Sequence, residues 1–181
     1  MTHTTDETTI DEQAGWWTRA GRLTRWLLGA FSLVAGLTWI LFTAHGPTAA
    51  LDVTVGVVLA AAGLVLLMPH RIRLPRLVTT IVMTMVGIAG TAAGLAHSVE
   101  RTCCSYAYVL DRGFPFTWAQ RAGAGADPAT AERLAGAANW TVDLVSLAVN
   151  LLLWAYAGML LVVIAVLVRQ RREGEPPDSA R

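Results

Sequence analysis

The sequence TVDLVSLAVNLLLWAYAGMLLVVIAVLV, residues 141–168, decides the fold class of this chain. Asp143 is its only charged residue. A helix crosses the hydrocarbon core of a bilayer with roughly 20 consecutive apolar residues. Within a single segment, only a helix satisfies its own backbone hydrogen bonds in lipid. We therefore expect residues 141–168 to form a membrane-spanning helix, long enough to tilt or to extend beyond the bilayer.

Three further apolar runs precede this one, at residues 27–44, 49–68 and 77–96. The whole chain is 54% hydrophobic and 15% charged, whereas soluble domains carry roughly 25% charged residues. The charges cluster between the runs, which disfavours the alternative of buried helices in a soluble protein. The sequence predicts an all-α fold: a four-transmembrane-helix bundle at residues 15–168, with a structured extracytoplasmic loop at 97–140 between the third and fourth helices.

The positions of the arginines predict the orientation in the membrane. Three short clusters flank the runs: Arg19, Arg22 and Arg25; Arg71, Arg73 and Arg76; Arg169, Arg171 and Arg172. Four crossings bring all three clusters to one side, which the positive-inside rule identifies as the cytoplasm. We expect a disordered cytoplasmic N-terminus at residues 1–14 and a cytoplasmic tail at 169–181. The use of Arg without Lys, with abundant Ala and Gly, indicates a bacterial protein, and hence the bacterial plasma membrane.

Small residues in the third run predict close helix packing. Gly87, Gly90 and Gly94 lie within it, the last two in GxxxG spacing. Such residues let helix backbones approach closely in lipid. They could form a dimerisation groove, but packing within the four-helix bundle is the favoured interpretation.

A polar stripe is predicted at the start of the fourth run. Asn139, Asp143, Ser146 and Asn150 follow spacings of four, three and four residues, which places them on one helical face. Polar residues inside a membrane face protein or water. The stripe could line an ion or proton path, although a polar seam that orients the helix is the favoured interpretation.

The segment 97–140 is too long for a simple connection, so we expect it to be structured. Asp127-Pro128 predicts a helix start, with a capping acceptor and proline at the first helical position. Aromatic residues alternate along the segment and predict an extended interaction face that could contact the membrane, the bundle or another protein. Its members are Tyr106, Tyr108, Phe114, Phe116 and Trp118.

Two cysteines and two histidines form a candidate metal or redox cluster. His45 and His97 end the first and third runs, and Cys103 and Cys104 follow in the outer loop, where Glu100 and Asp111 complete the candidate cluster. Thiolate and imidazole are ligands for soft metals or haem. Their spacing matches no established ligand motif, so we expect no bound cofactor.

Two short motifs carry a resemblance. Arg112-Gly-Phe-Pro-Phe-x-Trp118, followed by Asn139-x-x-x-Asp143 at the opening of the last run, resembles small bacterial multi-pass membrane proteins. The resemblance implies that the loop and the start of the fourth helix form one unit.

These features predict a non-enzymatic accessory or interaction subunit of a membrane complex, with a membrane-protein partner or a second copy of itself. Catalytic-triad, phosphate-loop and metal motifs are absent from the sequence, and a net charge of +1 gives no sign of nucleic-acid binding. Two alternatives stay open. One is a metal- or thiol-redox protein that uses the His/Cys cluster. The other is a small transporter that uses the polar stripe with Asp52.

Overall fold

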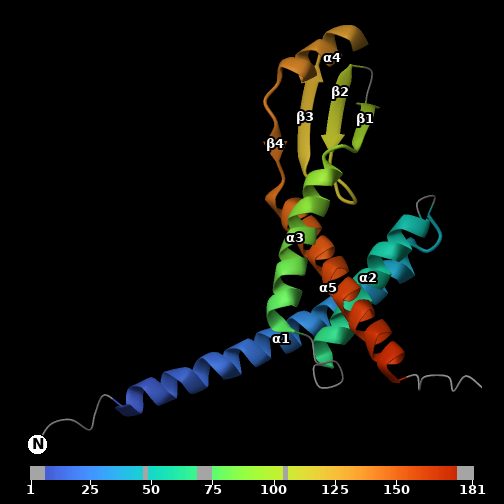
Figure 1. Ribbon diagram of the computed structural model, residues 1–181. Coiled ribbons are helices and arrows are strands. Elements are labelled where there is room, and N and C mark those ends of the chain that lie inside the picture. Colours follow the sequence, from blue (N-terminus) through green and yellow to red (C-terminus); the bar gives the residue numbers. More distant parts are fainter. Residues whose placement is uncertain (1–6, 47–48, 69–74, 104–105, 175–181) are drawn as a thin grey trace, which may run out of the picture. The chain divides into compact units, whose positions relative to one another are not determined.

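The computed structural model describes residues 7–46, 49–68, 75–103 and 106–174 (Figure 1). The chain forms two compact units, Met1–Arg73 and Leu74–Arg181. In chain order the elements are α1 (Glu7–Thr43), α2 (Ala49–Leu67), α3 (Arg76–Gly94), β1 (Ser98–Cys103), β2 (Ala107–Arg112), β3 (Ala119–Ala124), α4 (Pro128–Ala137), β4 (Thr141–Val142) and α5 (Leu144–Gly174).

Four helices are long and apolar enough to cross a membrane. These stretches are Arg19–Thr43, Ala49–Leu67, Leu77–Gly94 and Leu144–Arg171. The prediction of a mostly helical chain with four candidate membrane-spanning helices is confirmed. The all-α class is incomplete, however, because segment 98–142 also contains a four-stranded antiparallel sheet.

The two ends of the chain extend beyond the described residues. Residues 1–6 of the expected disordered N-terminus lie outside them, and α1 already includes Glu7 and the residues that follow it. Residues 175–181 of the expected tail lie outside them as well, while α5 continues to Gly174.

The first unit is an antiparallel pair of helices, α1 and α2, packed through glycines. A Cβ atom on Gly36 would lie 2.6 Å from the backbone of both Ala60 and Gly56, and one on Gly63 would lie 2.6 Å from Gly29 O. The two backbones therefore touch where side chains are absent, as is common between helices in lipid.

The second unit combines a helix pair with the sheet. α3 packs antiparallel on α5, with Gly87 against Ala155 and Gly158 against Val86. The strands follow the order β1-β2-β3-β4, and α4 covers one face of β2 and β3. A Cβ atom on Gly123 would lie only 2.5 Å from Ala131 O, so glycine on β3 lets α4 approach.

The start of α4 forms as the Asp-Pro pair predicts. Asp127 is the N-cap residue: its carboxylate accepts hydrogen bonds from Thr130 N (3.0 Å) and Thr130 Oγ1 (2.7 Å). Pro128 occupies the first helical turn, where it removes no needed hydrogen bond. The helix-bonded carboxylate has a lowered pKa, chiefly because the Thr130 hydroxyl donates to its ionised form.

Candidate functional site at the junction of the sheet and helices α3 and α5

Residues 113–118, here called the docked turn, join β2 to β3 and press against the helix pair. Gly113 has a φ of +130°, a conformation that side chains disfavour. Gly113 N donates a hydrogen bond to His97 O at 3.3 Å, just after α3 ends. The Phe114–Pro115 peptide bond is cis. The hydrogen bond from Gly113 therefore connects the start of the turn to the residues that follow α3.

Two side chains of α5 hold the docked turn. Asn150 is fully buried; its Nδ2 donates to Phe116 O at 2.6 Å, and its Oδ1 accepts from Phe116 N at 3.2 Å. Trp154 Nε1 donates to Phe114 O at 3.3 Å. On α3, Gly94 leaves room for the turn, since a Cβ atom there would lie 2.9 Å from Phe114 N and O. The turn thus lies between the two helices.

The docked turn contacts α5 well inside the helix and not only at its N-terminal end. At 1.5 Å per residue, Asn150 and Trp154 lie about 9 and 15 Å along the helix from Leu144. Both positions fall inside the candidate span Leu144–Arg171. At membrane depth, non-helical backbone is tolerated only where protein buries it and satisfies its polar groups. Asn150 and Trp154 supply those hydrogen bonds.

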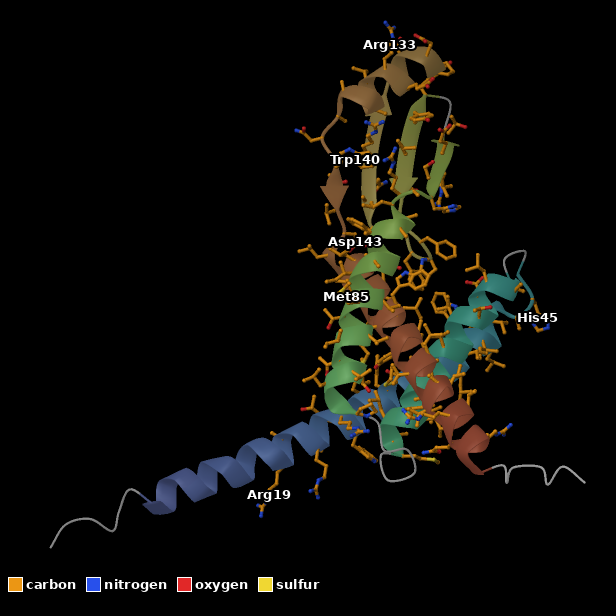
Figure 2. The ribbon with its side chains drawn as sticks, in the orientation of Figure 1. Arg19, His45, Met85, Arg133, Trp140 and Asp143 are labelled. Atoms are coloured by element: carbon orange, nitrogen blue, oxygen red, sulfur yellow. The ribbon has the colours of Figure 1, made fainter. Side chains whose placement is uncertain are left out.

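Asp143 caps α5 at the point where the sheet ends (Figure 2). Its Oδ1 accepts from Val145 N at 2.9 Å and Ser146 N at 3.3 Å, and its Oδ2 accepts from Ser146 Oγ at 2.7 Å. The Ser146 hydroxyl, followed by the backbone donors, lowers the pKa of the Asp143 carboxyl. Asp143 N also donates to Trp118 O at 2.8 Å, which ties the cap to the docked turn.

The residues of the predicted polar stripe therefore have separate surroundings. Asp143 and Ser146 form the cap of α5, and Asn150 holds the docked turn. Asn139 is exposed and lies before β4, because Thr141–Val142 pairs with β3 and α5 begins only at Leu144. The predicted helical run at 141–168 begins with these sheet residues.

A cavity of about 340 Å³ adjoins the docked turn, on the sheet face opposite α4. Asp111 on β2, Gln120 on β3 and Thr141 on β4 are register partners in a row across the sheet. Side chains that share this face line the cavity together with the first turn of α5. The lining includes Asp111, Trp118, Gln120, Thr141, Asp143 and Ser146.

The α4 side of the sheet carries two arginines stacked on one indole ring. Arg112 Cζ lies 5.2 Å and Arg121 Cζ 4.8 Å from the centre of the Trp140 ring. Arg121 Nη1 also donates to Gly136 O at 3.2 Å, at the end of α4. On the same face the pKa of Tyr108 is raised, first by partial burial and then by a hydrogen bond with Glu100. This face of the sheet therefore packs against α4, and Arg112 and Arg121 give it positive charge beside Trp140.

The predicted aromatic residues divide between two places. Tyr108 lies on β2 on the α4 side, and Tyr106 precedes β2 with half of its surface exposed. Phe114, Phe116 and Trp118 belong to the docked turn, which contacts α3 and α5.

The predicted metal or redox residues are divided between the two units. His45 is exposed in the first unit. His97, in the second, makes an edge contact with the Phe114 ring at 5.6 Å. Cys103 ends β1, and Cys104 lies outside the described residues. Within the described ranges, no group of three or more His, Cys, Asp or Glu residues could hold a metal ion.

The predicted glycines of α3 each meet the second unit's own residues. Gly87 lies against Leu151 and Ala155, Gly90 against the Trp154 ring, and Gly94 against Phe114. Sequence reasoning did not select Gln120 as a functional residue, and it placed Asp111 only in the candidate metal cluster. The strand register that aligns Asp111 with Gln120 had no clear signal, because β3, with the sequence AQRAGA, lacks apolar alternation.

Comparison with known proteins gives no match: no protein family, curated protein or solved structure is significantly similar to this chain.

Proposed function

We propose that this chain is a multi-pass protein of a bacterial plasma membrane that acts as a non-enzymatic accessory or interaction subunit of a membrane complex. In this proposal both termini are cytoplasmic, and the sheet with α4 stands on the outer surface. The arginine clusters before the first span and after the last support that orientation.

The docked turn is the observation that carries the proposal. Asn150 fastens the sheet to α5 by two hydrogen bonds, and Asp143 links the cap of α5 to Trp118. A binding surface is most precise when rigid elements support it. These hydrogen bonds hold the sheet on α5, and a surface that binds a partner needs such support.

The same bonds weigh against the transporter alternative. Asp143 and Ser146 bond each other and the helix start, and Asn150 is fully buried on Phe116. A conducting path needs polar groups that can exchange partners with an ion or with water. Asn150, the member of the stripe farthest along α5, uses both of its polar atoms on Phe116, so it is not available to an ion at that depth.

Site-specific photocrosslinking in the native host tests the proposal. A photoreactive residue at Ala122 or Ala124, exposed on the sheet face opposite α4, should give one discrete crosslinked product. The matched control carries the photoreactive residue in place of Val145. This position on α5 is 73% exposed and is expected to face lipid. A monodisperse monomer in mild detergent, with no product from either sheet position, would contradict the proposal.

A further inference from the structure

The cavity beside the docked turn has the volume of a small-molecule site and a mostly polar lining. Its volume of about 340 Å³ falls in the range of about 300–1,000 Å³ that such sites occupy. Carboxylates come from Asp111 and Asp143, an amide from Gln120, and an indole ring from Trp118. Docked turn, sheet and helix cap together form its walls, so the ligand site would be preorganised.

Asp111 is a buried carboxylate in the lining with unused hydrogen-bonding capacity. A carboxylate offers about four acceptor positions, and the Asp111 side chain is only 9% exposed. Among the described residues, its one side-chain partner is Arg101, whose Nε lies 3.5 Å from Oδ2 and whose side chain is 65% exposed. A buried carboxylate with so few partners is stabilised by any ligand that donates hydrogen bonds to it.

The charges around the cavity favour a cation. The cap hydrogen bonds lower the pKa of Asp143, so its carboxylate is ionised at neutral pH. Asp111 and Asp143 contribute two carboxylates to the lining, and Arg101 forms an ion pair with the first of them. A positive ligand beside Trp118 can also interact with the face of its ring.

The strand order separates the two carboxylates. Asp111 lies on β2 and Asp143 directly follows β4, with β3 between these strands. Two strand spacings of about 4.8 Å each therefore lie between them, and Gln120 occupies the intervening strand. A ligand that contacts both carboxylates needs positive groups at both ends.

We propose that this cavity binds a small linear organic cation with an amine at each end, one directed to Asp111 and the other to Asp143. Thr141 and Ser146 provide hydroxyl oxygens beside the second amine. The inference concerns the cavity alone and does not depend on the accessory role proposed above.

Isothermal titration of the full-length protein in detergent tests this inference with 1,5-diaminopentane as the probe. Two compounds of the same chain length are controls: neutral 1,5-pentanediol and anionic glutarate. Saturable binding of the diamine alone, weakened by added salt, is the expected result. Equal binding of the diol, or no saturable binding of the diamine, would overturn the proposal.

Three substitutions locate the binding. Asp111→Asn should weaken diamine binding by at least about tenfold, because it removes a charge-assisted hydrogen bond. Asp127→Asn is the matched control, since this residue caps α4 outside the cavity, and binding should be unchanged. Arg101→Gln should strengthen binding, because it removes the cation that competes for Asp111.

If Asp111→Asn fails to fold, Arg101→Gln still tests the inference, because the Arg101 side chain is exposed and its replacement should not disturb folding. Weaker or unchanged binding in Arg101→Gln would contradict the inference, as would wild-type affinity in a folded Asp111→Asn protein. Loss of binding in Asp127→Asn would show that the response comes from general destabilisation and would also count against the site.

Discussion

Asn150 holds both backbone groups of Phe116 from a fully buried position on α5. Replacement by leucine, which is similar in size, removes both of these side-chain hydrogen bonds to Phe116. Each lost hydrogen bond to a buried backbone group costs about 1–3 kcal/mol. We expect Asn150→Leu to lower the melting temperature in detergent and to speed amide exchange at residues 113–118.

Two further variants calibrate that loss. Trp154→Phe removes the hydrogen bond to Phe114 O and also part of the ring that packs on Gly90, so it should lower the melting temperature as well. Val145→Ala changes a residue that is 73% exposed, and its effect should stay within about 0.5 kcal/mol. If Asn150→Leu were as stable as Val145→Ala, the docked turn would not be held in this manner.

Asp127 and Asp143 predict a dependence of stability on acidity. Both carboxyls have a pKa below the ordinary value of 3.8 because hydrogen bonds favour the ionised form. A lowered pKa in the folded state stabilises the protein fully above the unfolded pKa, and this contribution is lost as the pH falls through the folded pKa. Between pH 7 and pH 5 these two groups should leave the melting temperature unchanged, whereas below about pH 4 they should lower it.

The double variant Asp127→Asn/Asp143→Asn isolates this contribution. Asparagine is also a good N-cap, so both helix starts should survive at neutral pH. The acid-induced decrease in melting temperature should become smaller by a few degrees, since other carboxyls still titrate. An unchanged decrease would show that the two caps contribute nothing to the acid sensitivity.

At the scale of elements, Gly94 sets how closely the docked turn approaches α3. A methyl group there would lie 2.9 Å from two backbone atoms of Phe114, which cannot rotate away as a side chain can. Gly94→Ala should therefore destabilise the second unit by about 1–3 kcal/mol. Gly136→Ala on α4 is the matched control, because no atom lies within 4 Å of the added Cβ, and it should stabilise by about 0.4–1 kcal/mol. Equal denaturation midpoints for the two variants would contradict the close approach.

The helices could be predicted from the sequence, whereas of the sheet only an extended aromatic segment could be predicted, for a physical reason. Run length and missing charge identify a membrane helix within one segment. A strand such as β3, Ala119–Ala124, has small residues and no apolar alternation, and its partners are β2, β4 and α4. The bond between Phe116 and Asn150 joins positions 34 residues apart, and no local pattern encodes that pairing. Only the resemblance in residues 112–143 suggested that the loop and the last helix belong together.

For the whole molecule, the two units each contain a pair of candidate membrane helices, and the arginines lie at matching ends. Arg25 Nε donates to Leu66 O at 3.2 Å, which places it at the C-terminal end of α2 in the first unit. Arg76 begins α3 and Arg169 lies near the end of α5, at the end of the second unit's helix pair away from the sheet. The proposed orientation assigns all these ends to the cytoplasmic side, as the positive-inside rule requires, and assigns the sheet to the outer side.

Single-cysteine variants in a Cys103→Ser/Cys104→Ser background test this orientation. Ala122→Cys lies on the exposed sheet and Gln170→Cys on the exposed end of α5. An impermeant maleimide should label the sheet position in intact cells almost as fully as in lysed cells, because water reaches it from outside. The helix-end position should be labelled only after lysis, since the charged reagent cannot cross the hydrocarbon core. The reverse pattern would invert the topology and place the diamine cavity in the cytoplasm. Labelling of both positions in intact cells would show that the arginine-bearing ends do not share one protected side.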